Sequence, residues 1–497
     1  MKKILVANRG EIALRIMRSA REMGIKTVAV YSEADRNSPH VRYADEAMCI
    51  GPPESAQSYL NEKKILAVCV ELKVDAIHPG YGFLSENASF ARKVSRAGIT
   101  FIGPSARSIE IMGNKLAAKE AVAKYDIPMV PGTAKAVKNV ATAKKKGKEI
   151  GYPLLIKAAA GGGGKGMRIV KKEKELEEQM KMAISEAISA FGDGSVFIER
   201  YVTSPRHIEI QILADKHGNT IHLFERECSI QRRHQKVIEE APSTVLSDEM
   251  RDAMGKAAIE VAKSCKYVGA GTVEFLYDGK QYYFLEMNTR LQVEHPVTEM
   301  ITGLDLVKEQ INIAQGKKLS VKQEDLKING HALEVRVYAE DPENNFLPDV
   351  GNLSIYKRPG GIGVRVDDGY EQGMDIPIYY DPMISKLIVH AKDRKTAIAR
   401  MIRAIDEYTI VGVKTTLSFC RFVLNHKSFT SGKFDTHFVS DYFDTRDKKS
   451  SGADKDERIL AAALAALIVH KNKSAKKLKT TSSNGRSKWR YNRALEQ

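Results

Sequence analysis

Residues 1–112 alternate between strand-like apolar runs and a helix-like spacing of apolar positions. Apolar runs at residues 3–6 and 27–31 predict strands, and apolar residues recur at helical spacing over residues 11–23 between them. Another apolar run at residues 76–78 leads into a glycine-rich turn. Because a helix that connects two strands favours parallel pairing, this pattern predicts a doubly wound parallel sheet.

A glycine-rich segment lies between two predicted strands further along the chain. Residues 160–166 read Ala-Gly-Gly-Gly-Gly-Lys-Gly, with strand-like runs at residues 153–157 and 167–170 on either side. Glycines let backbone N–H groups approach phosphate oxygens closely. The segment is not a Walker A loop, because its lysine is followed by glycine and not by Ser or Thr. A flexible linker is the alternative, but the flanking strands favour a hairpin whose tip folds over phosphates.

The most polar predicted strand follows the apolar residues 282–285. Alternate residues of a strand share a face, so five side chains would project to one side while the chain stays extended. These side chains are Glu286, Asn288, Arg290, Gln292 and Glu294. Carboxylates, an amide and a guanidinium on one face suit a hard divalent cation beside an anion. An exposed edge strand with solvated charges is the alternative, and the aromatic lead-in argues against it.

A predicted hairpin joins this polar strand to residues 272–276. A two-residue loop would place Glu274 and Glu286 on opposite faces of the hairpin. A three-residue loop at residues 277–279, with Gly279 in the left-handed conformation, would place both on one face. If both carboxylates bind one metal ion, the three-residue loop is required, and this is the loop that we predict.

Two further regions carry polar residues in patterns typical of a site. Residues 205–211 alternate as a strand with His207, Glu209 and Gln211 on one face, and residues 225–241 are dense in charged and amide side chains. Residues 330–446 then begin with a strand at 331–337 and include a helix at 394–407. We interpret them as an α+β end to the same body.

Length and charge limit the classes of function. A chain of 497 residues is too long for one core and predicts two to four domains. Its net charge is +16, but residues 447–497 contain 13 Lys and Arg against 5 Asp and Glu, which is half of the excess. A body that binds phosphates and other anions needs some of the remaining positive charge. The charge therefore favours no nucleic-acid partner.

Cysteine usage and hydropathy bear on location. The five cysteines are scattered, without the pair spacing of metal sites, which favours reduced thiols and a cytoplasmic protein. The longest apolar run, residues 459–469, is well short of the roughly 20 residues that span a bilayer, so we expect no membrane partner. Residues 447–497 form a basic tail with one predicted helix at residues 457–470. Two interpretations stay open: a partly disordered terminus, and a helix that docks on a partner subunit.

Taken together, the motifs of residues 1–446 resemble biotin carboxylase, the ATP-grasp component of acetyl-CoA, propionyl-CoA and pyruvate carboxylases. The motifs that carry the resemblance are residues 7–13, 78–87, 160–166, 231–236 and 286–296. It implies a doubly wound N-terminal domain (1–112), an ATP-grasp domain (113–316) with a mobile glycine-loop lid (about 130–203), and a C-terminal α+β domain (317–446) before the tail. The fold class is thus α/β and α+β multidomain.

The resemblance implies that ATP is gripped by the glycine loop, a hinge, and basic and polar side chains. These residues are Lys115, Lys157, Gly162, Gly163, Gly164, Glu199, Arg200, Tyr201, Val202, His207, Gln231, His234, Glu274 and Glu286. Magnesium or manganese bridging the phosphates would be held by Glu274, Glu286 and Asn288. Charge agrees with this, because carboxylates hold the cation while lysines and amides balance phosphate.

The chemistry of the family is likewise implied by the resemblance. The implied catalytic residues are Lys236, Arg290, Glu294 and Arg336; the bicarbonate site is Lys236, Arg290, Gln292 and the Val293 N–H; and Tyr81, Gln292 and Arg336 lie near biotin. Glu294 would deprotonate bicarbonate for attack on the γ-phosphate, giving carboxyphosphate. Its decomposition yields CO2 and phosphate, phosphate deprotonates the biotin ureido nitrogen, and Arg336 stabilises the enolate.

The resemblance also implies partners and leaves alternatives. The expected partners are a separate biotin carboxyl carrier protein and a carboxyltransferase subunit, together with a second copy of the chain in a homodimer. One alternative is another ATP-grasp enzyme, a carboxylate–amine ligase, which the bicarbonate-site residues disfavour. A second is a non-catalytic regulatory homologue, which the intact metal and base residues disfavour.

Overall fold

The computed structural model describes residues 1–446, except residues 134, 138, 160–165 and 234. By its contacts the chain separates into two units, Met1–Val439 and Ser440–Gln497. The helix predicted at residues 457–470 lies outside the described residues. Within the described part of the chain, no helix combines the length and the apolar character that crossing a membrane requires.

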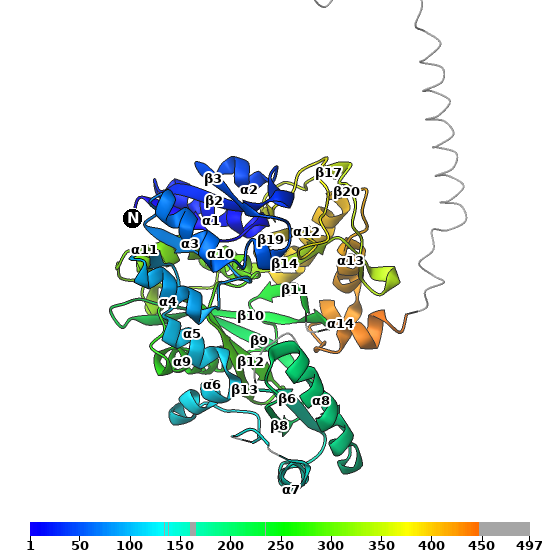
Figure 1. Ribbon diagram of the computed structural model, residues 1–497. Coiled ribbons are helices and arrows are strands. Elements are labelled where there is room, and N and C mark those ends of the chain that lie inside the picture. The colour runs from blue at the N-terminus through cyan, green and yellow to red at the C-terminus, as the bar shows by residue number, and fades with distance from the viewer. Residues whose placement is uncertain (134, 138, 160–165, 234, 447–497) are drawn as a thin grey trace, which may run out of the picture. The chain divides into compact units, whose positions relative to one another are not determined.

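Five parallel strands form the first sheet, in the order β3-β2-β1-β4-β5 (Figure 1). They are β1 (Lys3–Val6), β2 (Lys26–Ser32), β3 (Glu46–Gly51), β4 (Ala76–His78) and β5 (Thr100–Phe101). The main connecting helices are α1 (Gly10–Glu22), α3 (Glu62–Glu71) and α4 (Ala88–Arg96). Helix α1 buries Ile12, Ile16 and Met17 because helical spacing places them on one face. The predicted doubly wound sheet is confirmed.

The second sheet has eight strands in the order β13-β12-β9-β10-β11-β14-β19-β18, and its neighbours pair antiparallel. They are β9 (Arg206–Ala214), β10 (Thr220–Arg232), β11 (Gln235–Ala241), β12 (Gly269–Tyr277), β13 (Tyr282–Asn288), β14 (His331–Tyr338), β18 (Val364–Asp368) and β19 (Met383–Ala391). Its helices are α9 (Asp248–Ser264), α10 (His295–Thr302), α11 (Leu306–Ala314) and α12 (Arg394–Glu407). Because β11 pairs with β14, one sheet spans the predicted ATP-grasp and C-terminal regions.

The loop of the β12–β13 hairpin differs from the prediction. Tyr277 pairs with Tyr282, so four residues form the loop, and the Asp278 N–H donates to Gln281 O at 3.1 Å. The register then shifts by one at a β-bulge, and Glu274 pairs with Glu286. The predicted three-residue loop is wrong, but the shared face of the two carboxylates is confirmed. The bulge adds one residue to β13, and this extra residue produces the change of face that we had assigned to the loop.

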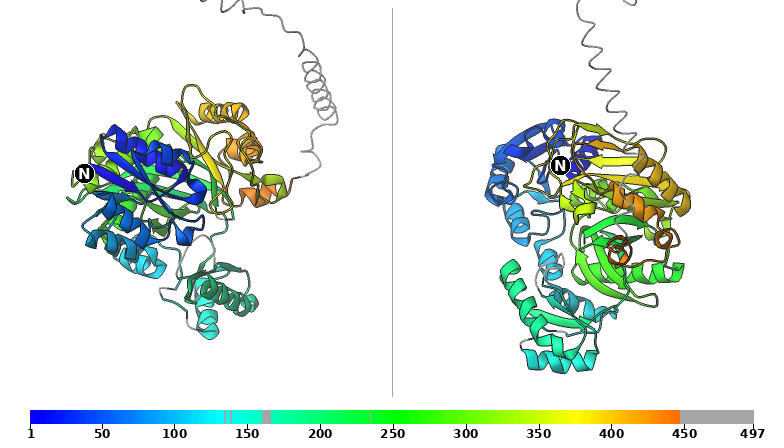
Figure 2. Two further views of the ribbon diagram at one scale, coloured as in Figure 1. Left: turned by 45° about the horizontal axis from the view of Figure 1, so that its top comes forward. Right: turned by 90° about the vertical axis from the view of Figure 1, so that its right-hand side faces the viewer.

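The lid is a small sheet in the order β7-β6-β8 with two helices (Figures 1 and 2). Its elements are β6 (Leu154–Ala158), β7 (Arg168–Val170), β8 (Val196–Arg200), α7 (Val140–Ile150) and α8 (Leu176–Phe191). Helix α8 buries Leu176, Met180 and Ala183 against Ile156 and Ile198. The β6–β7 pairing confirms the predicted hairpin, whose tip at residues 160–165 lies outside the described residues. In all three views the lid projects from the end of the unit that lies away from the first sheet.

The remaining elements are short and connect these layers. The helices are α2 (Pro39–Tyr43), α5 (Ala106–Gly113), α6 (Lys115–Val122), α13 (Leu417–Asn425) and α14 (Lys427–Thr430). The strands are β15 (Glu340–Asp341), β16 (Leu347–Pro348), β17 (Ile355–Lys357) and β20 (Thr409–Val411). Asn114 begins α6 by accepting hydrogen bonds from the N–H groups of Leu116 and Ala117, and this fixes the start of the helix that carries Lys115.

Candidate active site

Lys236 on β11 is the centre of a buried cluster of charges. Its ammonium contacts three carboxylates: Glu274 at 2.9 Å, Glu294 at 2.7 Å, and Glu209. Burial alone would lower the pKa of Lys236, but the three carboxylates raise it well above its usual value. Lys236 therefore stays charged at neutral pH and holds carboxylates from three separate segments together.

Arg226 on β10 contacts the residues of this cluster. The sequence analysis did not single it out. The guanidinium is fully buried and donates to Glu209, Gln211, Thr272, Gln292 and Thr298. A buried guanidinium is tolerated when its donors are satisfied, as they are here. Its 2.9 Å bond to Gln292 Oε1 leaves the amide nitrogen of Gln292 free to donate to Glu274 at 2.8 Å. The high density of charged residues at 225–241 indicated a site in this region. It could not show which of the arginines there has a buried side chain.

Glu294 lies between two cations. One carboxylate oxygen faces Lys236, and the other accepts from Arg336 Nη2 at 2.9 Å. Burial would raise the pKa of Glu294, but Lys236 and Arg336 outweigh it and hold the pKa well below its ordinary value. Arg336 also donates to Glu239 at 2.6 Å. The structure thus brings three of the four predicted catalytic residues into direct contact.

Glu274 and Glu286 are opposed across the β12–β13 hairpin, and Asn288 donates to Glu274 at 2.9 Å. Burial and the charge of Glu274 raise the pKa of Glu286. Burial would also raise the pKa of Glu274, but Lys236 and His207 lower it well below its usual range. A divalent cation between the carboxylates would remove their repulsion, so this oxygen-rich donor set fits Mg²⁺ or Mn²⁺.

Two lysines contact Glu199 of the lid strand β8, and a third lysine lies near Glu286. Lys157 pairs with Glu199 at 2.7 Å, Lys119 also contacts it, and Lys115 lies 3.9 Å from Glu286. Burial and the neighbouring ammonium groups lower the pKa of Lys157 to about 7 and that of Lys119 to about 8. The charge of Glu286 opposes the shift at Lys157 but is outweighed. Such a group of lysines favours a polyanion. Lys119 was not among the predicted residues.

The other residues predicted to bind ATP make contacts elsewhere in the unit or lie outside the described residues. Arg200 donates to the Tyr283 hydroxyl at 2.7 Å, the Tyr201 hydroxyl lies 3.0 Å from His437 Nε2, and Val202 is partly buried. Gln231 and His207 are in contact at 2.9 Å, and His207 Nε2 lies 2.9 Å from Glu274. Gly162, Gly163, Gly164 and His234 lie outside the described residues.

The loop between β13 and α10 carries Arg290. Its guanidinium donates to Glu86 at 2.8 Å and to Asn288 Oδ1 at 3.0 Å. Burial would lower its pKa, but Glu86 and the site carboxylates raise it. Glu86, which sequence reasoning did not single out, therefore fixes Arg290 at the edge of the cluster, next to the proposed metal ligand Asn288.

The predicted biotin residues are not all in direct contact. Gln292 and Arg336 both belong to the Lys236 cluster, whereas the Tyr81 hydroxyl donates to Glu11 on α1. The Val293 carbonyl accepts from Lys386 at 2.9 Å. Sequence reasoning missed both Glu11 and Lys386 as neighbours of the site.

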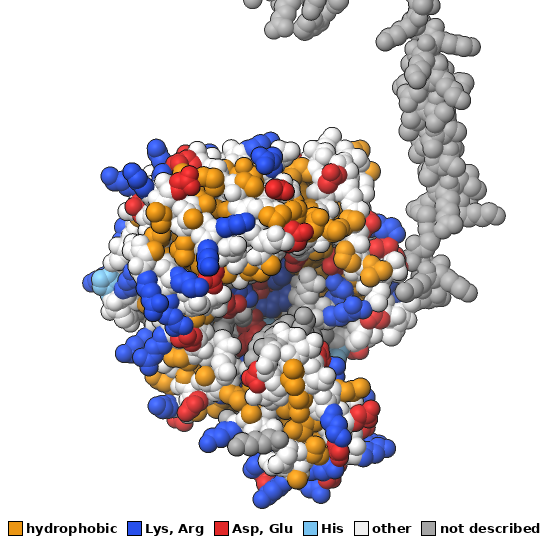
Figure 3. Space-filling view, in the orientation of Figure 1, with side chains coloured by type: hydrophobic (Ala, Val, Ile, Leu, Met, Phe, Trp, Pro, Cys, Tyr) orange, Lys and Arg blue, Asp and Glu red, His pale blue; other side chains and the backbone are white. Residues whose placement is uncertain are grey.

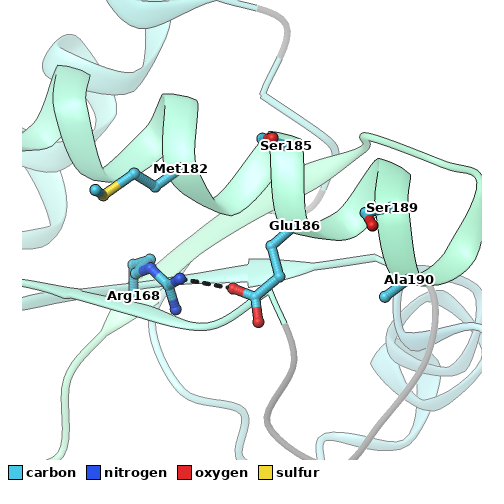
Figure 4. Close-up of a pocket in the computed structure, with 6 residues that line it drawn as sticks. All are labelled: Arg168, Met182, Ser185, Glu186, Ser189 and Ala190. Atoms are coloured by element: carbon cyan, nitrogen blue, oxygen red, sulfur yellow. Dashed lines mark ion pairs between the residues drawn. The ribbon is translucent and has the colours of Figure 1, made fainter.

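Two hollows are visible on the surface. One lies between the lid and the rest of the unit, and Lys, Arg, Asp and Glu side chains are visible inside it (Figure 3). The other lies on the lid between β7 and α8 (Figure 4). Arg168, Met182, Ser185, Glu186, Ser189 and Ala190 line it, and Arg168 pairs with Glu186 at 2.8 Å. Of the predicted site residues that the structure describes, none lines the lid hollow.

Comparison with known proteins identifies the family. Three family models match in succession: the biotin carboxylase N-terminal domain at residues 1–109, the carbamoyl-phosphate synthase L chain ATP-binding domain at 114–322, and the biotin carboxylase C-terminal domain at 334–441. Biotin carboxylase 1 of Bacillus subtilis is 54% identical over 89% of this chain and 99% of its own length. The chain belongs to the biotin carboxylase family. The predicted family is confirmed.

Solved biotin carboxylases share the whole fold. A β,γ-ATP complex of the Campylobacter jejuni enzyme is 47% identical, with a TM-score of 0.87 over 89% of this chain and 99% of that chain. The biotin carboxylase domain dimer of Hydrogenobacter thermophilus 2-oxoglutarate carboxylase, with MgADP, ADP and bicarbonate, is 49% identical, with a TM-score of 0.86 over 89% and 97%. The human propionyl-CoA carboxylase alpha chain is 51% identical over 94% of this chain but 65% of its own length. The multidomain α/β and α+β fold class is confirmed.

Proposed function

We propose that the residues around Lys236 carry out the ATP-dependent carboxylation of biotin by bicarbonate, through carboxyphosphate. The observation that carries this assignment is the position of Glu294, an ionised carboxylate held by Lys236 and Arg336. Beside it lies the opposed pair Glu274 and Glu286. One site therefore combines a base, an anion-binding group and ligands for a divalent cation.

The nucleotide would lie between the lysines of α6 and β6 and the carboxylates of the β12–β13 hairpin. Lys115, Lys119 and Lys157 would neutralise phosphate oxygens, and Glu274, Glu286 and Asn288 would hold Mg²⁺ or Mn²⁺. The bound metal ion supplies positive charge at the transferring phosphate. Phosphate binding also favours the charged forms of Lys119 and Lys157, whose pKa values are lowered in the free protein.

Glu294 would take the proton of bicarbonate. Its lowered pKa makes it a weak base while Lys236 and Arg336 are its partners. Bicarbonate bound to Lys236 and Arg290 would share those cations and add a negative charge nearby, so the pKa of Glu294 rises when the substrate is present. The deprotonated oxygen then attacks the γ-phosphate, and ADP leaves from the opposite side.

Carboxyphosphate would then break down to CO2 and phosphate. Phosphate takes the proton from the ureido nitrogen of biotin, and that nitrogen attacks CO2. Arg336, buried and held by Glu239 at 2.6 Å, would stabilise the biotin enolate. Tyr81 and Gln292 would lie beside the biotin rings.

We further propose that the chain acts within a biotin-dependent carboxylase assembly. The partners would be a separate biotin carboxyl carrier protein, a second copy of this chain and a carboxyltransferase subunit. Relatives that belong to such assemblies support this, including the solved biotin carboxylase subunit of pyruvate carboxylase, 49% identical over 89% of this chain with a TM-score of 0.78. Co-purification of the native assembly, followed by identification of its members, tests these partners.

Bicarbonate-dependent ATP hydrolysis stimulated by free biotin tests the reaction. A carboxylate–amine ligase would hydrolyse ATP in response to an amine and a carboxylate substrate. A non-catalytic homologue would show neither response. Absence of the biotin-stimulated reaction in folded, magnesium-loaded protein would overturn the proposal.

A further inference from the structure

Lys386 on β19 is fully buried beneath the loop that carries Glu294. Its ammonium donates to the Val293 carbonyl at 2.9 Å. It also lies 3.3 Å from Glu11 Oε2 and 4.0 Å from Asp367 Oδ2. A buried ammonium is costly unless carboxylates pair with it and acceptors satisfy its N–H groups, and these three contacts supply both.

The carbonyl held by Lys386 belongs to the peptide that leads into Glu294. Helix α10 begins at the next residue, His295, so this peptide joins the bicarbonate loop to the helix. The hydrogen bond from Lys386 therefore sets the orientation of the Val293 backbone and of the Glu294 backbone N–H. It acts one residue before the proposed base and on the same residue whose N–H is proposed to bind bicarbonate.

The other side of Lys386 leads to Tyr81. Glu11 faces Lys386 with one carboxylate oxygen and accepts from the Tyr81 hydroxyl with the other. The Tyr81 backbone is fixed as well, because Asn8 Nδ2 donates to its carbonyl at 2.7 Å. A continuous series of contacts thus runs from Tyr81 through Glu11 and Lys386 to Val293.

We propose that Lys386 is a positioning residue that couples the biotin-side residue Tyr81 to the bicarbonate loop at Val293 and Glu294. This rests on the proposed function. Lys386 touches neither substrate. It sets the loop geometry in which bicarbonate is bound and deprotonated, and it transmits a displacement of Tyr81 by biotin to that loop. A purely structural cross-link would stabilise the fold without linking the two substrates.

Steady-state kinetics on the full chain separate these roles. We expect Lys386→Met to raise the KM for bicarbonate about tenfold, because a charge-assisted hydrogen bond to the loop is lost. We also expect it to abolish stimulation by free biotin while the KM for MgATP stays unchanged. Glu11→Gln keeps the Lys386–Val293 bond, so it should reduce biotin stimulation and leave the KM for bicarbonate unchanged. Lys392→Met, at an exposed lysine just after β19, is the matched control.

Amide hydrogen exchange over residues 289–296 gives a readout that does not depend on activity. Lys386→Met should increase exchange there, and Lys392→Met should not. Wild-type bicarbonate KM or wild-type exchange in folded Lys386→Met would overturn the inference. If Lys386→Met fails to fold, unchanged biotin stimulation in Glu11→Gln overturns it. Loss of biotin-stimulated hydrolysis in the wild type counts against the proposed function instead, and the exchange experiment still decides the role of Lys386.

Discussion

Glu294 is buried and Glu286 is partly buried, and their surroundings give these two glutamates of one segment opposite electrostatics. Two cations hold Glu294 ionised, whereas burial and the facing Glu274 disfavour the charge of Glu286. Lys115 lies 3.9 Å from Glu286, farther than either cation lies from Glu294, so Glu286 gains more from a metal ion. Glu294 is therefore ionised before any substrate binds, whereas a bound cation would stabilise the charge of Glu286.

Amide substitutions distinguish these two roles. Glu294→Gln should preserve MgATP affinity and reduce turnover by about 10²- to 10⁴-fold, because only the proton acceptor is lost. Glu286→Gln should weaken MgATP binding about tenfold or more, because a ligand charge is lost. MgATP titration and bicarbonate-dependent ATP hydrolysis measure the two effects. Equal MgATP affinity in both variants would show that the roles are misassigned.

Lys119 on α6 and Lys157 on β6 predict a pH dependence for nucleotide binding. Lys157 and Lys119, with pKa values of about 7 and about 8, lose protons in the free protein as the pH rises through these values. Phosphate favours the charged forms, so binding takes up protons and MgATP affinity falls between about pH 7 and pH 9. Calorimetric titration in buffers of different ionisation enthalpy measures the uptake. It should diminish in Lys157→Met, and an affinity independent of pH would contradict the assignment.

At the scale of elements, alternation and spacing predicted strands in the five-stranded, the eight-stranded and the three-stranded sheet, but not β10, β18 and β19 or the helices α9, α10 and α11. Residues 394–407 form α12 as predicted, and the β6–β7 hairpin was predicted from its flanking apolar runs. The β12–β13 loop was not predicted, because the bulge depends on neighbours outside the hairpin. The Phe284 N–H donates to Pro128 O at 2.7 Å, so a segment more than one hundred residues earlier covers the edge of β13. Nothing in the hairpin sequence specifies that contact.

Site residues that lie in recognisable sequence motifs could be predicted. Residues whose place in the site depends only on tertiary packing could not. Lys236, Glu294 and Arg336 were predicted by resemblance and lie in contact. Arg226 and Lys386 lie in strands that contain other basic residues. The periodicity of these strands cannot show which basic side chain pairs with a carboxylate. Their partners come from separate strands and loops, so only the folded sheet identifies them.

Strands β11 and β14 place two buried glutamates opposite each other, and this predicts a stability effect. Glu239 and Glu334 are cross-strand partners, and neither oxygen of Glu334 has a hydrogen-bond partner among the described residues. Burial raises the pKa of Glu239 from 4.5 to about 7, and burial with its acidic neighbours raises that of Glu334 well above its usual value. For raised acids, stability is present below the unfolded pKa and falls as the pH rises.

Glu334→Gln should therefore increase the thermal midpoint at pH 8 and have little effect near pH 4.5. The amide needs no proton to stay neutral, and its nitrogen can donate to the unpartnered oxygen of Glu239. Thermal unfolding across this pH range measures the difference between the variant and the wild type. If the difference in midpoint between variant and wild type did not change with pH, ionisation of Glu239 and Glu334 would not be what destabilises the protein at high pH.

At the scale of the whole first unit, the eight-stranded sheet joins regions that sequence analysis predicted as separate domains. β11 from the ATP-grasp region pairs with β14, from Ile238–Val335 to Ala241–Ala332. Lys236 on β11 and Arg336 on β14 both contact Glu294. The boundary predicted at residue 317 therefore crosses a continuous sheet. Each side supplies backbone partners that the other needs.

Truncation tests this dependence. A fragment of residues 1–316 leaves β11 with an unpaired edge and removes Arg336 and Lys386, so we expect it not to fold cooperatively. A fragment of residues 1–446 keeps the sheet and should unfold with the same midpoint as the full chain. Circular dichroism during thermal unfolding measures both, and a cooperative transition in the shorter fragment would contradict the expectation.

The same β11–β14 pairing sets an order of events during synthesis on the ribosome. β11 leaves the exit tunnel before β14, and β19, which carries Lys386, follows later still. Until then the nascent chain presents the open edge of β11, the strand that carries Lys236, Glu239 and Glu240. The yield of active protein should therefore depend on the speed of translation between residues 241 and 331. It should also depend on whether a chaperone binds that edge.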